Sequence, residues 1–236
     1  MPQIKINKAK PIVISIGGSL IVPNSGPDAR FLSELRKMIL PRAAKGQRFV
    51  IVTGGGKTAR HYIQAAVNVR KSIDPEDLDW LGIHATRLNG HLVRTLFREI
   101  AYPVVLKNPM RVPLKWQGQI LVSAGWKPGW STDYVACRIA KRLGVDSIIN
   151  ASNIDYVYDR DPHKYKDAIK LEEMTWKDFR KIVGDEWDPG KSAPFDPVAS
   201  KFCHKNKIKV AIVNGVDMKN VDAVLSGRTF KGTLLA

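Results

Sequence analysis

The sequence has little of what several classes of protein require. Its only two cysteines, Cys137 and Cys203, exclude a disulfide-rich scaffold, and their apolar, helix-like surroundings are typical of reduced, buried thiols. No run approaches the roughly 18 apolar residues of a membrane-spanning helix. The N-terminal segment MPQIKINKAK lacks the apolar stretch of a signal peptide. We therefore expect a cytoplasmic globular protein that does not associate with membranes.

Acidic residues are scarce, since 22 Asp and Glu stand against 38 Lys and Arg, which gives a net charge of +16. Such a balance favours anionic partners, namely nucleic acids, anionic membranes or phosphorylated metabolites. The basic residues recur in separate segments, at 5–10, 36–48 and 201–209, and dispersed charge is more typical of a solvated surface than of a nucleic-acid footprint. Because no RNA-recognition signature is present either, nucleic-acid binding is kept only as an alternative.

What the sequence does contain is an alternation of short β-branched runs and helical patterns. Strands are predicted at residues 12–16, 49–52, 120–122, 147–150 and 209–213. Helices are predicted after Asp28, after Gly56, after Ser131, over residues 175–183 and after Asp196. Apolar runs separated by helices indicate a largely parallel open sheet with both faces covered. The predicted fold class is therefore α/β, in a single domain over residues 1–236.

The pattern also predicts one helix with an apolar face and one long loop. The helix after Gly56 carries Ala59, Ile63, Ala66 and Val67 on one face. Residues 184–197 are rich in Gly, Pro and Asp and predict a long loop, and long loops in compact domains are often functional.

Two glycine clusters each follow a predicted strand and precede a predicted helix. They are Gly17-Gly18-Ser19 and Gly54-Gly55-Gly56-Lys57. Glycine at such a turn lets backbone N–H groups point at an anion, and the helix N-terminus adds a favourable dipole. Two such sites at equivalent turns of one sheet suit a reaction between two phosphate-bearing molecules, although each cluster alone could be only a tight turn.

The second cluster has features of two known nucleotide-binding motifs. A Walker A loop needs a glycine five residues before the Gly-Lys-Thr at 56–58, and Ile51 occupies that position. The G-x-G-x-x-A spacing at 54–59 does fit a relaxed dinucleotide-binding fingerprint, with Asp74 and Asp79 at suitable distances beyond it. A dinucleotide-dependent oxidoreductase therefore stays an alternative, which a test of NAD binding would decide.

Two further segments carry polar groups at the ends of predicted elements. Residues 125–133, GWKPGWSTD, precede a helix and offer backbone, hydroxyl and lysine donors to an anion. Residues 152–162 directly follow a strand, where open α/β sheets bind ligands. Their aromatic side chains could flank a purine, and their carboxylates could hold a ribose or a metal. A helix cap and a solvated turn are the simpler explanations of these two segments.

Seven segments follow one another in a recognisable order. They are IGGS, GGGKTARHYI, DWLGIHATRLNG, PGWSTD, SNIDYVYDRDP, SAPFDPVASK and SGRTFKGT. In order and spacing they resemble the uridylate kinases of the amino acid kinase superfamily, most closely the archaeal-type branch, from about Ile12 to the C-terminus. The resemblance implies a three-layer α/β/α fold, transfer of the γ-phosphoryl group of ATP to UMP with Mg²⁺, and homo-oligomers such as dimers or hexamers.

The resemblance also implies which residues form the sites. It places ATP at Gly18, Ser19, Gly56, Arg60, Ser152, Asn153, Tyr158 and Asp161. It places the acceptor at Gly55, Asp79, Trp126, Lys127, Pro128, Gly129, Trp130, Ser131 and Thr132. It implies Asp133 and Asp196 at the transfer centre, where we also expect Lys57 and Arg60 to act. The acceptor-binding half would span about residues 1–147 and the ATP-binding half about residues 148–236.

The positive charge at the transfer centre is one point where the sequence departs from the family pattern. Ser15 stands where many members of the superfamily carry a lysine that neutralises phosphate, so another cation is required. Lys57, Arg60 and Lys201 are the candidates. The five histidines and two cysteines show no metal-ligand spacing, so we predict no metal site made by protein ligands alone.

The acceptor loop and the ATP edge also depart from the pattern. Trp126 and Trp130 replace the usual Thr and His, and Tyr156 replaces the usual Gly. The tryptophans leave open a different small phosphate or carboxylate as the acceptor. The charge of +16 and the missing lysine at Ser15 leave open a catalytically inactive protein that binds a nucleotide or RNA.

Overall fold

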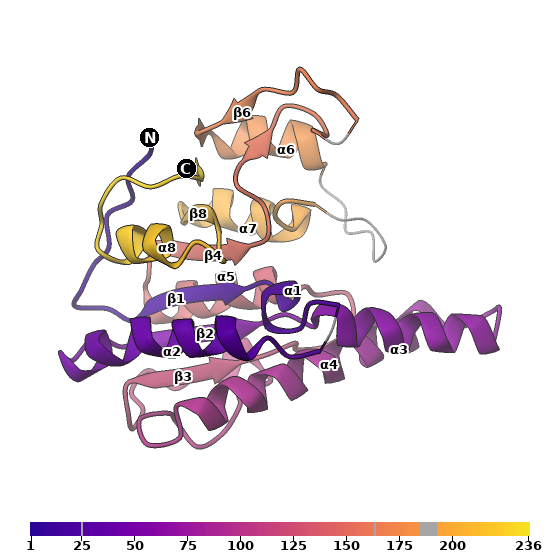
Figure 1. Ribbon diagram of the computed structural model, residues 1–236, viewed down its shortest axis with the longest axis horizontal. Helices are drawn as coiled ribbons and strands as arrows, with labels where there is room; N and C mark the ends of the chain where they lie inside the picture. Colours follow the sequence, from indigo (N-terminus) through magenta and orange to yellow (C-terminus); the bar gives the residue numbers. More distant parts are fainter. Residues whose placement is uncertain (25, 163, 185–192) are drawn as a thin grey trace.

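The central sheet is built mainly from parallel strands. The computed structural model describes residues 1–24, 26–162, 164–184 and 193–236. Within them, a seven-stranded sheet has the order β3-β2-β1-β4-β8-β9-β7 (Figure 1). Its strands are β1 (Ile12–Ile16), β2 (Phe49–Thr53), β3 (Ile120–Ser123), β4 (Ser147–Ser152), β7 (Glu173–Met174), β8 (Lys209–Asn214) and β9 (Thr233–Leu235). The pairing of β8 with β9 is antiparallel, and the other pairs of this sheet are parallel.

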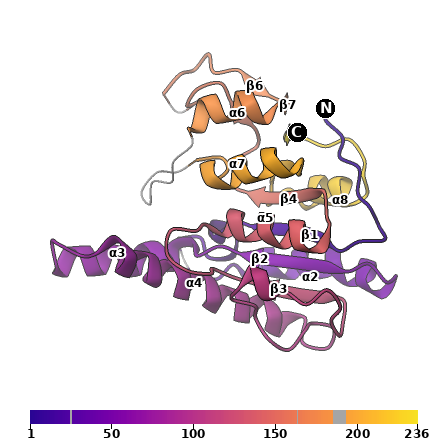
Figure 2. The same ribbon diagram turned by 180° about the vertical axis from the view of Figure 1, so that it is seen from behind.

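Alternate residues of the central strands face opposite layers of the molecule. In β1, Ile12, Ile14 and Ile16 pack in one core cluster, with residues of α2 (Ala29–Ala44) and α8 (Met218–Leu225). Val13 packs in the other cluster, with residues of α5 (Thr132–Leu143) and α7 (Pro197–Asn206). Accordingly, α2 lies in front of the sheet in Figure 1, and α5 lies in front of it in Figure 2. The predicted α/β fold with three layers is therefore confirmed.

Side-chain caps fix several helix starts at the positions that the sequence predicts. Asp28 and Ser131 each accept a hydrogen bond from the backbone N–H three residues further on, at 2.9 and 3.1 Å. Thr175 caps α6 (Trp176–Val183) and Asp196 caps α7 in the same way. Each cap satisfies a backbone donor that the first helical turn leaves free.

The main element absent from the predicted pattern is α4 (Pro75–Leu96), which packs on β2 and β3. Asp74 caps this helix and Pro75 occupies its first position, which is the same Asp-Pro start that indicates α7. The buried face of α4 includes Thr86, Asn89 and Gly90. Polar residues and glycine on the buried face weaken the apolar periodicity from which a helix is predicted.

Helix α3 (Gly56–Val69) extends beyond the sheet and packs along α4 (Figure 1). It carries the predicted apolar face, but none of its residues is buried in the described part of the chain. Val67, for example, is 40% exposed. The packing along α4 leaves Ala59, Ile63 and Ala66 of this face half-buried and Val67 exposed, so α4 covers the apolar face of α3 only in part.

Short elements complete the described fold. They are α1 (Gly18–Ile21), the 3-10 helix η1 (Pro109–Arg111), β5 (Val157–Tyr158) and β6 (Lys170–Leu171). β5 and β6 form a separate antiparallel pair, drawn near the top of Figure 1. Most of the long loop predicted at 184–197 lies outside the described residues. Among the described helices, none combines the length and apolar character needed to cross a lipid bilayer.

Candidate functional site

The two glycine turns lie in direct contact at one edge of the sheet. β1 and β2 are adjacent and parallel, so both strands end at the same edge, and the N–H of Gly54 donates to the carbonyl of Ile16 at 2.9 Å. A Cβ on Gly18 would lie only 2.6 Å from the backbone nitrogen of Gly55, so no side chain fits there. Gly56 also has a φ of +63°, which favours glycine. The prediction of two neighbouring anion sites is therefore consistent with the backbone geometry.

Two basic residues lie in the first turn of α3, next to these glycines. The backbone N–H of Lys57 donates to the carbonyl of Val22 at 3.0 Å, which ties this turn to the end of α1. The side chain of Lys57 is half-buried and that of Arg60 is exposed. Within the described residues, neither side chain forms a hydrogen bond or ion pair, so both can reach an anion held at the glycine turns.

A buried polar cluster lies beneath the glycine turns, between the sheet and the starts of α5 and α7. Ser15 Oγ and Asn150 Nδ2 donate to the same oxygen of Asp133, at 3.1 and 2.9 Å. The backbone N–H of Asp196 approaches the other Asp133 oxygen at 3.4 Å. Asp133 and Asp196, which lie far apart in the sequence, therefore meet as predicted for a common centre. Ser15 serves here as a hydrogen-bond donor to a carboxylate.

Burial changes the acidity of both carboxyl groups. Burial and, to a smaller extent, the neighbouring charge of Asp196 raise the pKa of Asp133 from 3.8 to about 7, although the hydrogen bonds from Ser15 and Asn150 act in the opposite direction. Burial also raises the pKa of Asp196, against hydrogen bonds from Ala199 and Ser131. Two desolvated acids side by side create a site that favours a cation or a shared proton.

Helix α4 contacts the predicted acceptor loop, residues 126–132, and Gly125 directly before it. Arg87 donates through Nε to the carbonyl of Gly125 at 3.2 Å and through Nη2 to the carbonyl of Trp126 at 2.8 Å. Thr86 Oγ1 accepts a hydrogen bond from the N–H of Gly125 at 2.7 Å. From the same helix, Asn89 Nδ2 donates to the carbonyl of Gly54 at 2.8 Å. One helix therefore positions both the acceptor loop and the second glycine turn.

These α4 contacts were not predicted from the sequence. Thr86 and Asn89 lie three residues apart and therefore on one helical face, and both are buried. Asn150, in the middle of β4, was not predicted either. These three residues share one signal in the sequence. Each is a polar side chain at a position where a core strand or a buried helix face is expected.

The predicted acceptor residue Asp79 contacts the acceptor loop. Its Oδ2 accepts a hydrogen bond from the N–H of Gly129 at 2.7 Å. In the loop, the Trp126 and Trp130 rings lie 6.0 Å apart, and the Lys127 ammonium lies 4.8 Å from the Trp126 ring centre. Pro128 is half-buried between these residues, and Ser131 and Thr132 form the cap and first residue of α5. The predicted acceptor residues of this loop thus adjoin α4.

The Trp130 ring continues the aromatic packing into the second core cluster. It stacks on Tyr134 with ring centres 4.1 Å apart, and Tyr134 meets the edge of Phe202 on α7 at 5.5 Å. The acceptor loop is therefore anchored on both α5 and α7 by large apolar contacts.

The residues predicted to bind the ATP base and ribose lie in two places. Ser152 ends β4 beside the first glycine turn, since the N–H of Gly17 donates to the carbonyl of Ala151 at 2.8 Å. Asn153 follows it and is exposed. Tyr158 lies in β5 of the smaller sheet, and Asp161 lies in the exposed segment that follows β5. The structure therefore places Ser152 at the glycine edge, with Tyr158 on the β5–β6 pair and Asp161 in the connection between these two strands.

The oxygen donors present fit a metal ion that arrives with a phosphate ligand. Among the described residues, no group of three or more His, Cys, Asp or Glu side chains is placed to hold a metal. Mg²⁺ is typically bound through one or two carboxylates together with substrate phosphates. Asp133 and Asp196 offer two adjacent carboxylates of that kind, next to the glycine turns.

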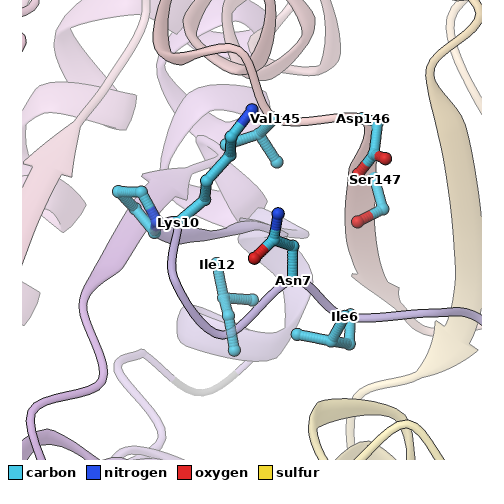
Figure 3. Close-up of a pocket in the computed structure, with 8 residues that line it drawn as sticks. Ile6, Asn7, Lys10, Ile12, Val145, Asp146 and Ser147 are labelled. Atoms are coloured by element: carbon cyan, nitrogen blue, oxygen red, sulfur yellow. The ribbon is translucent and has the colours of Figure 1, made fainter.

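A small cavity at the opposite edge of the sheet is separate from this site. Figure 3 shows that it lies between the N-terminal arm, with Asn7 and Lys10, and the segment that leads into β4, with Asp146 and Ser147. Lys10 Nζ donates to the carbonyl of Gly144. Since the cavity lies at the amino ends of β1 and β4, it is remote from the glycine turns and is no part of the candidate site.

Comparison with known proteins gives consistent matches over nearly the whole chain. The sequence pattern described as the amino acid kinase family matches residues 10–214. The uridylate kinase of Thermococcus sibiricus is 35% identical over 231 residues, which cover 95% of this chain and 98% of that protein. The uridylate kinase of Methanocaldococcus jannaschii is 33% identical over 226 residues, covering 94% and 99%.

Solved structures agree with these sequence matches. The crystal structure of uridylate kinase from Archaeoglobus fulgidus is similar with a TM-score of 0.79 and 29% identity, covering 96% of this chain and all of that one. The UMP kinase from Bacillus anthracis shares the fold, with a TM-score of 0.76 at 19% identity.

Proposed function

Because the chain belongs to the amino acid kinase family, we propose that it is a uridylate kinase, which transfers the γ-phosphoryl group of ATP to UMP and yields ADP and UDP. The archaeal relatives that match more than nine-tenths of the chain carry this activity in their names. We expect the reaction to take place in the cytoplasm, as part of pyrimidine nucleotide synthesis.

The observation that carries the proposal is the contact between the two glycine turns. Phosphoryl transfer needs in-line positioning and neutralisation of charge more than covalent chemistry from the protein. A Cβ on Gly18 would lie 2.6 Å or less from the backbone of the second turn, so the two turns can approach each other only as glycines. Their backbone N–H groups can therefore bring two phosphates together without steric hindrance. The N-terminus of α3 adds a favourable dipole at the same point.

We assign the two substrates to the two sides of this contact. Gly18 and Ser19 in the first turn, with Gly56 and Arg60, would bind the ATP phosphates, and the residues after β4 would bind its ribose and base. Gly55, Asp79 and the loop at 126–132 would bind the acceptor. The hydrogen bonds from α4 to this loop support a preorganised acceptor side.

The charge at the transfer centre would come from three sources. Lys57 and Arg60 extend from the first turn of α3 and would neutralise the transferred phosphoryl group. Asp133 and Asp196 would hold Mg²⁺ together with the ATP phosphates, and Mg²⁺ would offset the charge that develops during transfer. Lys201, which is exposed on α7 one turn beyond the Asp196 cap, is a further candidate cation.

The exposed apolar side chains of α3 support an oligomer. Tyr62, Val67 and Val69 are 64%, 40% and 91% exposed, and exposed apolar surfaces mark association sites. We therefore expect a dimer or a larger assembly such as a hexamer.

The test is an acceptor panel with MgATP in a coupled assay of ADP release. UMP should stimulate ADP release more than CMP, AMP, GMP, dTMP or a small carboxylate such as glutamate. Asp79→Asn should raise KM for UMP, because Asp79 holds Gly129, whereas Asp77→Asn, on the exposed start of the same helix, should not. Absence of stimulation by UMP would reject the proposal.

A different acceptor is the second candidate, and the aromatic acceptor loop favours it. The rings of Trp126 and Trp130, 6.0 Å apart, lie in the loop assigned to the acceptor and replace smaller or more polar side chains there. If another phosphate or a carboxylate gives the largest stimulation in the same panel, this second function is correct. ATP binding without turnover, together with RNA binding that weakens steeply with salt, would instead indicate the non-enzymatic alternative.

A further inference from the structure

The two cysteines of the sequence meet in the core. Cys137 lies on α5 and Cys203 on α7, and the distance between the two sulfur atoms is 3.0 Å. Both side chains are fully buried, and both are free thiols in the structure. The sequence contains no other cysteine, so each thiol has one possible partner within the chain.

The pair lies directly behind the candidate transfer centre. Cys137 follows Asp133 by one helical turn, and Cys203 follows Asp196 by two turns. α5 belongs to the predicted acceptor-binding half and α7 to the ATP-binding half. A covalent bond between the two sulfurs would therefore tie the helix that carries Asp133 to the helix that Asp196 caps.

We propose that Cys137 and Cys203 form an intramolecular disulfide that cross-links α5 to α7. The sulfur–sulfur distance in a disulfide is about 2.05 Å, so an approach of about 1 Å between two helices that already pack together would complete the bond. Neither helix has to change its place in the fold.

The chemistry balances with a low-molecular-weight disulfide as the oxidant. The two S–H bonds of Cys137 and Cys203 are lost and one S–S bond forms. The two protons and two electrons pass to the oxidant, which becomes two thiols. The reaction proceeds through a mixed disulfide at one cysteine, which the other cysteine then displaces.

Burial determines when this reaction can occur. The attacking species is a thiolate, and burial together with the neighbouring Cys203 raises the pKa of Cys137 well above its usual range. The packed Cys137 thiol is therefore unreactive, and both thiols are closed to an oxidant because they are fully buried. The bond thus forms while α5 and α7 are still apart, during folding or in a local opening. Once the helices pack, the same burial shields the disulfide from reductants, so the cross-link is structural.

The expected consequence is stabilisation. The bond closes a loop between positions 66 residues apart, which restricts the unfolded chain strongly. For a chain of this size, the midpoint of thermal unfolding should rise by roughly 10 °C on oxidation. The inference does not depend on the identity of the acceptor and can be tested without an activity assay.

The experiment compares the full-length chain after refolding with oxidised glutathione and after refolding with dithiothreitol. The oxidised sample should show a mass lower by about 2 Da for the two lost hydrogens, no thiol titratable under denaturing conditions, and a peptide pair linked through Cys137 and Cys203. Its unfolding midpoint should be higher than that of the reduced sample. Cys137→Ala, Cys203→Ala and the double variant should show one midpoint under both conditions.

Three results would overturn the proposal. They are two titratable thiols in folded monomer after oxidative refolding, a stable mixed disulfide with glutathione, and a linkage found only between chains. An oxidised monomer that melts below the reduced one would overturn it as well, because the packing of α5 and α7 would then be incompatible with the bond. The mass and thiol measurements are made on the unaltered chain, so the result stands even if an alanine variant fails to fold.

Discussion

Replacing Asp133 with asparagine should change how the stability of the protein depends on pH. The carboxyl group is buried, and its pKa of about 7 in the folded chain compares with 3.8 for an unperturbed side chain. Between these two values the folded chain holds a proton that the unfolded chain has released. Stability therefore falls as pH rises through this window, because the unfolded state then binds fewer protons than the native state.

The magnitude follows from the two pKa values. A tenfold change in an equilibrium constant is about 1.4 kcal/mol, so the full effect of this one group is about 4 kcal/mol. Most of it lies within an accessible range: between pH 5 and pH 8 the wild-type chain should lose about 2.5 kcal/mol that Asp133→Asn does not lose. The asparagine cannot ionise and keeps an oxygen that can accept from Ser15 and Asn150.

Urea unfolding at pH 5, 6, 7 and 8 measures this difference directly. The free energy of unfolding of Asp133→Asn, relative to wild type, should increase steadily over the series. Asp146→Asn, which removes an exposed carboxylate at the opposite edge of the sheet, is the matched control and should track the wild type. Parallel curves for wild type and Asp133→Asn would refute the reasoning, because Asp133 would then ionise as readily in the fold as in the unfolded chain.

Three other substitutions probe the site. Gly18→Ala should lower the free energy of unfolding by about 1–3 kcal/mol, because its Cβ would overlap the second turn. Gly82→Ala, where a Cβ has only an ordinary contact at 3.9 Å, is the control in the same thermal unfolding assay. Equal unfolding midpoints for the two variants would contradict the contact between the turns. Arg87→Ala removes the hydrogen bonds from Arg87 to the carbonyls of Gly125 and Trp126, so steady-state kinetics should show KM for the acceptor raised roughly tenfold with KM for ATP little changed. Arg98 is an exposed arginine beyond the end of α4, and Arg98→Ala should have no effect. An equal rise in both KM values for Arg87→Ala would argue against a role at the acceptor side. Lys57→Gln should lower kcat by roughly 100-fold while Lys57→Arg retains most of it, and an unchanged kcat in the glutamine variant would assign the neutralising charge to another residue.

The strands of the sheet could be predicted because they are buried on both faces. Residues such as Val50, Ile51 and Val122 form uninterrupted apolar runs, as parallel strands between two helical layers require. The caps at Asp28, Ser131 and Asp196 could be predicted because a capping side chain acts within one helical turn of its own position. Both signals are local in the sequence.

The parts that could not be predicted depend on contacts between distant segments. α4 buries Thr86 and Asn89, whose partners Gly125 and Gly54 lie 39 and 35 residues away. The polar residues on its buried face weaken the apolar periodicity, although the Asp-Pro start was available. In the same way, the apolar face of α3 correctly indicated a helix but could not show that α4 covers this face only in part.

The candidate site also has parts that could be predicted from the sequence and parts that could not. That the two glycine turns are neighbours followed from the order of parallel strands, and the convergence of Asp133 and Asp196 came from the family resemblance. The partners of Asp133 could not be anticipated, because Ser15 and Asn150 are polar residues inside strands that otherwise read as core. Their role is visible only when the carboxylate between them is placed.

Because the two glycine turns touch through their backbones, the main chain alone sets the distance between the two predicted phosphate sites. The turns are joined through the pairing of Ile16 with Thr53 at the ends of β1 and β2, and no side chain intervenes. A slip of one residue between these strands would shift one phosphate site by one residue relative to the other. It would also move every side chain of the slipped strand to the opposite face of the sheet. Catalytic competence and the register of β1 against β2 should therefore be lost together on heating, in a single event.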